Sequence, residues 1–323
     1  MRSPRSLSRQ RGIALILVIW LSTLLMVIAG SFVYAMRTDA KAARNAALIA
    51  QGDALAQAAV ARCVMELYKG QGSPEVWKRD GEARSWAFDG VEVRVRLSDE
   101  SAKIDVNTAN NELLKGLFRY AGLSDEDAAK LLDAVLDWRD PDSLKRTNGA
   151  EEAEYEQAGL KYRPANYPFQ STEELQLVLG FRPELYQRIA PMITVYSRQP
   201  GVNPHLATRP VLTLIPGVTP EQVDQFLAER DLARKEGRPN PIFTAAGAYA
   251  TYAQTAAVTV RADVAFEGGV SVSREAVAML SPQYPKRPYT FLAWREISRA
   301  MDAKGAAPDA GASAKEARDG KLR

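Results

Sequence analysis

The chain has 323 residues, of which 46% are hydrophobic and 25% charged, a balance that excludes a wholly disordered or collagen-like protein and allows two or three domains. The formal charge is +3, but four arginines precede the first apolar run, so the remainder has 38 basic against 39 acidic residues and lacks the bulk basicity that holds nucleic acid by its phosphates. A single cysteine, Cys63, excludes an internal disulfide framework, and a single histidine, His205, argues against a His-rich metal site or a histidine-based triad.

The first predicted element is a membrane-spanning helix. The stretch from Ile13 to Met36 carries no charge, and its 24 residues are long enough, at about 1.5 Å per residue, to cross the ~30 Å hydrocarbon core. The four arginines before it, at positions 2, 5, 9 and 11, outweigh the mixed charges after it. This asymmetry predicts a single pass through the inner membrane with a cytoplasmic N-terminus and a periplasmic remainder.

A glycine, Gly12, stands directly before the apolar run and resembles the cleavage site of a type IV prepilin leader. The resemblance implies that a membrane aspartyl protease, the prepilin peptidase, cuts between Gly12 and Ile13, and that the new N-terminal residue is methylated. The alternative is a simple N-terminal anchor in which Gly12 is a chance residue.

The helical pattern continues beyond the membrane. Apolar residues recur at spacings of three to four and seven until glycines and a proline end the pattern after residue 69; they are Leu48, Leu55, Ala59, Cys63 and Leu67. One helix from Ile13 to about Tyr68 would be roughly 80 Å long, half in lipid and half packed on a soluble domain. This is the shape of a pilin subunit, in which Cys63 is expected to be a small buried hydrophobic residue.

Most pilins have a Glu at the fifth mature position, where its carboxylate meets the terminal amine of a neighbouring subunit in the filament core. Counted from Ile13, that position is Leu17. A buried carboxylate without a partner costs several kcal/mol, so it is tolerated only where an amine is supplied. Leu17 therefore suits a subunit at the filament tip, which has no subunit above it.

Strand patterns flank a long helical region. Alternating residues predict a strand from Val91 to Leu97, a hairpin over 257–280 that turns at Gly268 and Gly269, and a last strand over 288–297. The helical region, 107–247, then reads as an insertion. The predicted fold class is α+β: a type IV pilin-like fold, with a long N-terminal helix and a small antiparallel sheet, that carries a large inserted α-helical domain.

The insertion contains a repeat that resembles helix-hairpin-helix units. Residues 106–134 align with residues 202–230, with hairpins at Gly122 and Gly217, and 171–189 is a shorter echo. Ser124 and Thr219 are predicted to cap the second helix of their units. Such units often bind DNA phosphates, but acidic residues follow the first two hairpins, which favours a structural or protein-docking role.

An acidic loop within the insertion suggests a metal site. Residues 137–174 hold nine acidic and five basic residues, with candidate ligands beside a turn rich in Pro, Asn and Gly; they are Asp140, Asp142, Glu151 and Glu152. Oxygen ligands without Cys or His favour calcium over zinc. The alternative is a solvated acidic loop with salt bridges to Arg139, Lys145 or Arg146.

Taken together, the motifs resemble the minor pseudopilin K family of type II secretion systems. The motifs are Arg11-Gly12, Leu17, Asp105-Val106-Asn107-Thr108-Ala109, Asp137-Trp138-Arg139-Asp140, Asn148-Gly149-Ala150-Glu151, Tyr162 to Asn166, Ser171-x-x-Glu174-Leu175 and Pro216-Gly217-Val218. The resemblance implies a tip complex with minor pseudopilins I and J above the major pseudopilin G. That complex starts assembly of a periplasmic pseudopilus that moves folded exoproteins toward the outer membrane. It also implies calcium binding in the region of the acidic loop.

The expected organisation is a leader over 1–12, the long helix over 13–69, strands over 70–106, the inserted helical domain with its acidic loop over 107–200, a second helix-hairpin-helix-like unit over 201–247, strands over 248–300 and a disordered tail over 301–323. The sequence contains no Gly-x-Ser-x-Gly elbow, phosphate loop or HExxH motif, so we expect no enzyme. Two alternatives stay open: a competence-type pseudopilin that handles DNA, and a membrane-anchored periplasmic hydrolase.

Overall fold

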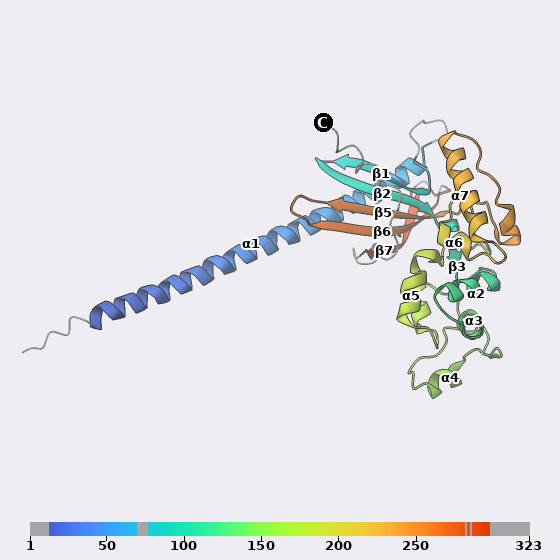
Figure 1. Cartoon of the computed structure of the whole chain (residues 1–323), viewed down its shortest axis with the longest axis horizontal. Helices are drawn as coiled ribbons and strands as arrows, with labels where there is room; N and C mark the ends of the chain where they lie inside the picture. Colours follow the sequence, from blue (N-terminus) through green and yellow to red (C-terminus); the bar gives the residue numbers. More distant parts are fainter. Residues whose placement is uncertain (1–12, 70–76, 282, 285, 298–323) are drawn as a thin grey trace, which may run out of the picture.

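A computed structural model describes residues 13–69, 77–281, 283–284 and 286–297. The predicted leader, with Gly12, and the predicted tail lie outside these described residues. Figure 1 shows a long helix that projects from a body of two lobes, one built on a sheet and the other helical.

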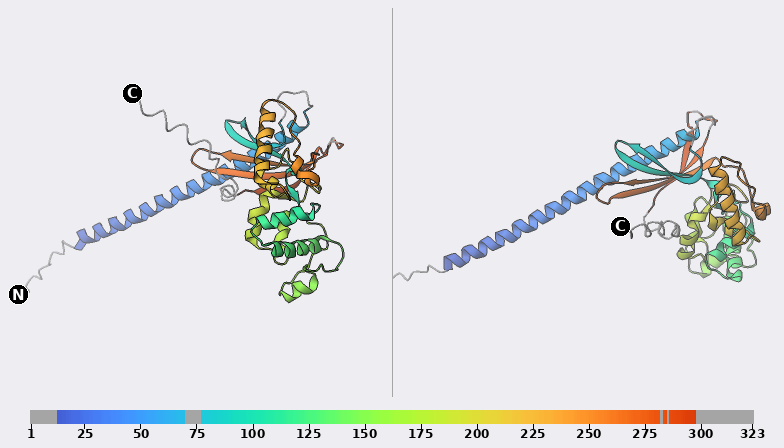
Figure 2. Two further views of the ribbon diagram at one scale, coloured as in Figure 1. Left: turned by 45° about the vertical axis from the view of Figure 1, so that its right-hand side comes forward. Right: turned by 45° about the horizontal axis from the view of Figure 1, so that its top comes forward.

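Helix α1 (Ile13–Leu67) is unbroken over 55 residues, which makes it about 82 Å long. Its N-terminal part stands clear of the body, and its C-terminal part, from Gly52 onward, packs against the sheet (Figure 2). The predicted single helix is confirmed.

The sheet is antiparallel throughout and has the strand order β1-β2-β5-β6-β7, so β1 and β7 are its edge strands. The strands are β1 (Asp80–Phe88), β2 (Val91–Asp99), β5 (Ala257–Ala265), β6 (Ser271–Leu280) and β7 (Tyr289–Glu296). The strand pattern predicted β2, the β5–β6 hairpin and β7. It missed β1, because this edge strand has mostly exposed or half-buried side chains and so does not alternate cleanly.

The first core lies between α1 and one face of the sheet. Leu55, Ala59 and Cys63 are buried there against strand residues such as Val95 and Val260. Burial raises the pKa of the Cys63 thiol to about 12, so it acts as a small hydrophobic residue, as predicted. A Cβ on Gly52 would lie 2.5 Å from a methyl of Val272 in β6, so only glycine lets α1 approach the sheet this closely.

The second lobe is inserted between β2 and β5 and has its own apolar core, which runs from Ile104 to Ala246. A short parallel pair, β3 (Ile104–Asp105) and β4 (Ile193–Thr194), opens and closes its first part. Its helices are α2 (Asn111–Tyr120), α3 (Asp125–Arg139), α4 (Glu152–Gln157), α5 (Pro183–Ile189), α6 (Arg209–Thr213) and α7 (Pro220–Lys235). Short 3₁₀ turns complete it: η1 (Glu100–Ala102), η2 (Thr172–Leu177), η3 (Ala190–Met192) and η4 (Thr244–Tyr249).

Two repeated helix pairs form as the sequence indicated. The α2–α3 pair turns at Gly122 (φ +104°) and the α6–α7 pair turns at Gly217 (φ +79°). Ser124 and Thr219 accept hydrogen bonds from the backbone N–H groups of Asp127 and Gln222 and so cap α3 and α7. In the echo, η2 takes the place of the first helix, before the turn at Gly180.

A buried polar cluster joins the two lobes. Glu100 is almost fully buried and accepts hydrogen bonds from Lys103 Nζ (2.8 Å) and from the hydroxyls of Thr194 in the insertion and Thr259 in β5. Beside it, the carboxylate of buried Asp99 accepts from the backbone N–H and the hydroxyl of Thr255. Because the carboxylates of Glu100 and Asp99 are buried, tilting one lobe against the other would leave buried charges without their hydrogen bonds.

Candidate functional site

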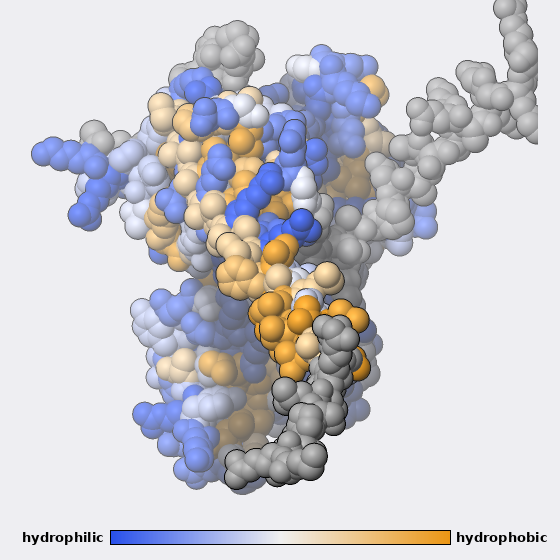
Figure 3. Space-filling view, turned by 90° about the vertical axis from the view of Figure 1, so that its left-hand side faces the viewer, coloured by the Kyte–Doolittle hydropathy of each residue, from blue (hydrophilic) through white to orange (hydrophobic). Residues whose placement is uncertain are grey.

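The first half of α1 is an exposed apolar surface. Every large apolar side chain from Leu15 to Met36 is exposed, and by length and composition α1 could cross a membrane. Figure 3, seen from the side from which α1 projects, shows a hydrophobic column between largely hydrophilic lobes. Ile13 is the first residue of α1, and Leu17, one turn further, is 62% exposed. An apolar surface of this size needs lipid or neighbouring helices to cover it.

The acidic loop follows α3 and is organised around one arginine. The Asp137 carboxylate is fully buried and accepts hydrogen bonds from Arg146 Nη1 (2.7 Å) and from the Arg146 backbone N–H (3.2 Å). The same guanidinium also pairs with Asp140. These two charge-assisted contacts raise the pKa of Arg146, so one cation neutralises two carboxylates one helical turn apart.

Gly149 allows the loop to close over Asp137. A Cβ at this position would lie 1.8 Å from Asp137 Oδ2, so no other residue fits without displacing the carboxylate. Two residues on, Glu151 is 8% exposed, and it caps α4 together with Glu154, whose carboxylate accepts from the Glu151 backbone N–H at 2.9 Å. Burial, and then the charges of nearby carboxylates, raise the pKa of Glu151 to about 7.

Within the described part of the chain, Asp140 Oδ1, Glu151 Oε1 and Asn166 Oδ1 are buried without a hydrogen-bond partner. Asn166 belongs to the cluster because its amide donates to the backbone carbonyl of Asp142 (2.9 Å). Asp142 itself is exposed, and its carboxylate accepts from the Leu144 backbone N–H. A buried oxygen that accepts no hydrogen bond can instead coordinate a hard cation such as calcium. These three oxygens therefore fit the expected metal.

Two observations qualify the expected ligand set. The Glu152 carboxylate forms an exposed ion pair with Arg163 (3.4 Å), whereas the charges of Asp137, Asp140 and Asp142 are among the main causes that raise the pKa of Glu151. Among the described residues, no three His, Cys, Asp or Glu side chains are already grouped as a metal site. Arg146 pairs with Asp137 and with one carboxylate oxygen of Asp140, so Oδ1 is the oxygen of Asp140 that is open to a cation.

Sequence reasoning missed Asp137 and Asn166. Asp137 precedes Asp140 by three residues on the same helix face, a spacing that could have indicated it. Asn166 lies in a separate segment, and only folding brings it to Asp142.

The helix pairs do not offer a phosphate-binding surface. The first turn of α3 carries Asp125, Glu126 and Asp127, and that of α7 carries Glu221, so phosphate approaching either helix start would meet carboxylates. His205 is held between loops, with Nε2 2.9 Å from the carbonyl of Pro241 and its ring 4.7 Å from that of Tyr252.

Comparison with known proteins points to one family. Residues 95–201 match the family model described as type II secretion system (T2SS), protein K. The chain is 25% identical over 246 residues to the type II secretion system protein K of Pseudomonas aeruginosa, an alignment that covers 68% of this chain and 72% of the relative. The proteins of the same name from Pectobacterium carotovorum (26% identical, 58% of this chain) and Klebsiella pneumoniae (27%, 57%) are matched over 63% and 62% of their length, less than two thirds.

One solved structure has the same fold. It is the crystal structure of the GspK-GspI-GspJ complex from the enterotoxigenic Escherichia coli type 2 secretion system, one chain of which matches with a TM-score of 0.54 and 14% identity. The match covers 81% of this chain and 99% of that chain. The expected pilin-like fold with an added helical domain is thereby confirmed.

Proposed function

We propose, since the chain belongs to the type II secretion system protein K family, that it acts as the minor pseudopilin at the tip of the pseudopilus. There it starts assembly of the filament and supports export of folded proteins from the periplasm through the outer membrane. The observation that carries this proposal is the division of α1 into an exposed apolar N-terminal part and a C-terminal part packed on a pilin-type sheet. A helix of this kind can reside in the membrane before assembly and then enter a filament core without refolding.

The proposal includes the partners of the tip. The structural relative from E. coli comes from a complex with GspI and GspJ, which supports minor pseudopilins I and J as neighbours. The major pseudopilin G would lie below them, the prepilin peptidase would act at Gly12, and exoproteins would meet the tip. The chain would cross the inner membrane once, with its N-terminus in the cytoplasm and both lobes in the periplasm.

Two features support the end position rather than a place along the shaft. Leu17 supplies no carboxylate for the amine of a subunit above, yet the Ile13 amine can receive one from a subunit below. The helical lobe lies at the end of the sheet, beyond the docked part of α1 (Figure 1). A lobe of this bulk is easier to place once at an end than at every step of a helical filament.

The test of this function is secretion together with co-purification. Deletion of the gene should stop release of type II exoproteins, and the full chain should restore it. The detergent-extracted chain should co-purify with minor pseudopilins I and J of the same organism. Normal secretion in the deletion strain would overturn the proposal.

We also propose that the acidic loop holds calcium through Asp140, Asp142 and Glu151, with Asn166 and Asp137 beside them and Glu152 outside. Calcium would neutralise carboxylates that otherwise repel one another, and its coordination would hold the loop in one conformation. If it binds only the folded protein, it stabilises that state by roughly 2.7 kcal/mol at a hundredfold excess over Kd.

The full chain should then melt at a higher temperature in calcium than in chelator, and Asp140→Ala with Glu151→Ala should erase the difference. Magnesium should help less, because its small octahedral shell fits a loose carboxylate loop poorly. Equal melting in calcium and chelator, with no metal in the purified protein, would leave the loop a solvated acidic surface.

A further inference from the structure

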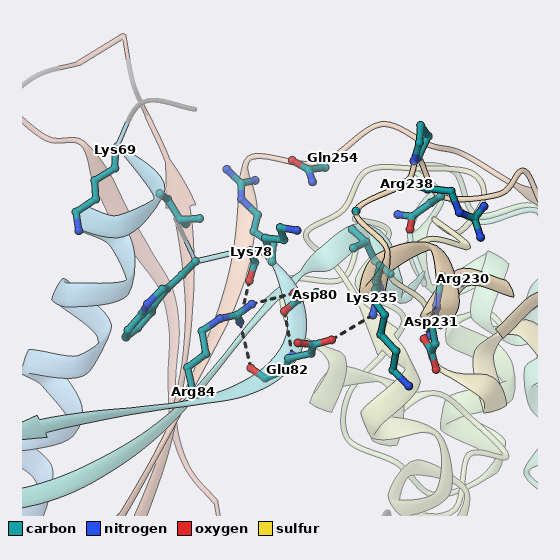
Figure 4. Close-up of a pocket in the computed structure, with 18 residues that line it drawn as sticks. Lys69, Lys78, Asp80, Glu82, Arg84, Arg230, Asp231, Lys235, Arg238 and Gln254 are labelled. Atoms are coloured by element: carbon teal, nitrogen blue, oxygen red, sulfur yellow. Dashed lines mark hydrogen bonds and ion pairs between the residues drawn. The ribbon is translucent and has the colours of Figure 1, made fainter. Parts of the chain in front are cut away.

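A basic cleft of about 1280 Å³ lies between the two lobes, where β1 and the end of α1 face α7 (Figure 4). Its lining holds eight lysines and arginines against three acidic residues, an excess of five positive charges. The whole chain has a formal charge of only +3, so the rest of the protein is net acidic. The positive charge is therefore concentrated in this cleft and does not reflect the overall composition of the chain.

Some of these cations are already used within the protein. Arg79 donates to the buried Asp99 carboxylate (3.2 Å) and to the Thr255 carbonyl (2.7 Å), and Arg84 pairs with Asp80 (2.9 Å). Two cations on opposite sides of the cleft form no ion pair or hydrogen bond with the described residues. Lys78, just before β1, and Lys235, in the last turn of α7, are exposed, and their ammonium groups have no partner within the described part of the chain.

The α7 side of the cleft keeps cations close together. Arg230 donates through Nη1 to the carbonyls of Pro204 (3.0 Å) and Ala207 (2.8 Å), and its Nε lies 3.7 Å from the Asp231 carboxylate, a loose ion pair. Burial, and then the neighbouring charge of Arg234, lower the pKa of Arg230. Arg234 lies 3.7 Å from Glu82 of β1, a loose ion pair across the cleft. An anionic ligand would relieve this repulsion.

We propose that this cleft binds an acidic segment of a partner polypeptide, in which Asp or Glu alternate with apolar residues. The lining combines the cations with apolar Leu67, Trp77 and Leu206, which suits a ligand with both kinds of side chain. The volume exceeds that of ordinary small-molecule pockets, about 300–1,000 Å³, and suits a length of chain. The proposal goes beyond the tip function and does not depend on it.

Other sources of negative charge fit less well. A regular polyphosphate or nucleic acid would meet the carboxylates of Asp80, Glu82 and Asp231, whereas a peptide can place backbone N–H groups there. Lipid headgroups of the anchoring membrane are remote, because the 31 residues of α1 between Met36 and Leu67 span about 46 Å. The ends of this chain are also unsuitable. Residues 1–12 have four basic and no acidic residues, and residues 298–323 have six basic and four acidic.

The test uses the full chain in nanodiscs of phosphatidylcholine and a labelled synthetic peptide in which Glu alternates with Val and Ser. Fluorescence anisotropy should show binding that weakens as salt rises from about 0.05 to about 0.5 M, as expected for exposed charges. The same peptide with Gln for Glu should bind far more weakly. Lys78→Gln with Lys235→Gln should weaken binding about fivefold or more, since it removes two unpaired charges.

The matched control is Lys130→Gln with Lys161→Gln, which removes the same charge at exposed positions outside the cleft. It should leave the affinity unchanged, and Lys78→Arg with Lys235→Arg should retain binding. Equal weakening by both Gln pairs would overturn the proposal. So would indifference to Glu or Gln in the peptide, binding of polyphosphate but not peptide, or occupation of the cleft only through self-association in sedimentation experiments.

Discussion

Replacement of Gly149 by alanine should unfold the acidic loop while leaving the sheet intact. The added Cβ would lie 1.8 Å from Asp137 Oδ2 and 2.6 Å from its Cγ, so the carboxylate or the loop must move. Asp137 is fully buried, and its contacts to Arg146 are what neutralise it. Breaking a buried ion pair costs about 3–5 kcal/mol, and because the loop backbone can shift, we expect a loss of about 3 kcal/mol in local stability.

The matched control is Gly159→Ala. This glycine, after α4, has φ +73° and nothing within 4 Å of its Cβ position, so the change should cost about 1 kcal/mol of backbone strain and no contact. Hydrogen exchange of residues 137–157 in chelator reads the local free energy directly. If Gly149→Ala exchanges no faster there than Gly159→Ala, the loop does not close over Asp137 as described.

Three further predictions follow from the other sites. Gly12→Val should block cleavage, so that membrane-extracted protein begins at Met1 instead of Ile13 in N-terminal sequencing; a mature N-terminus in the variant would contradict this. Leu17→Glu should place a carboxylate in the filament core without an amine above it, so that assembly is impaired or the carboxylate takes up a proton. Normal secretion with filaments of normal length would contradict the tip position. In chelator, the free energy of unfolding should fall as pH rises from about 4.5 to about 7, because folded Glu151 keeps its proton over this range and the unfolded chain does not. Glu151→Gln should remove this fall, which amounts to at most about 3 kcal/mol in total, and an unchanged melting profile would count against it.

Elements with a strong apolar period were predictable from the sequence. The alternation from Val91 to Leu97 became β2, and the stripe through Leu55, Ala59 and Cys63 became the buried face of α1. Local capping chemistry placed the start of α3 at Ser124. In each case the periodicity or the capping residue lies within a short stretch of chain, so folding has little freedom to change the outcome.

The remainder depends on contacts between distant segments. Edge strand β1 has no clean alternation because it buries little. Asn166 reaches the acidic loop only through a hydrogen bond to Asp142, 24 residues earlier. The basic cleft exists because the fold places α7 opposite β1, and nothing near Lys78 or Lys235 in the sequence indicates that they share a surface. The overall composition does not indicate the cleft either, because acidic residues in the rest of the chain offset its excess of cations.

If this chain acts as proposed, one copy of it terminates each pseudopilus. The most direct measurement is immunogold electron microscopy of pseudopili from cells that carry an epitope on the exposed loop around Leu144. A tip subunit should give label at a single end of each filament. Label distributed along the shaft, in proportion to the major pseudopilin, would contradict it.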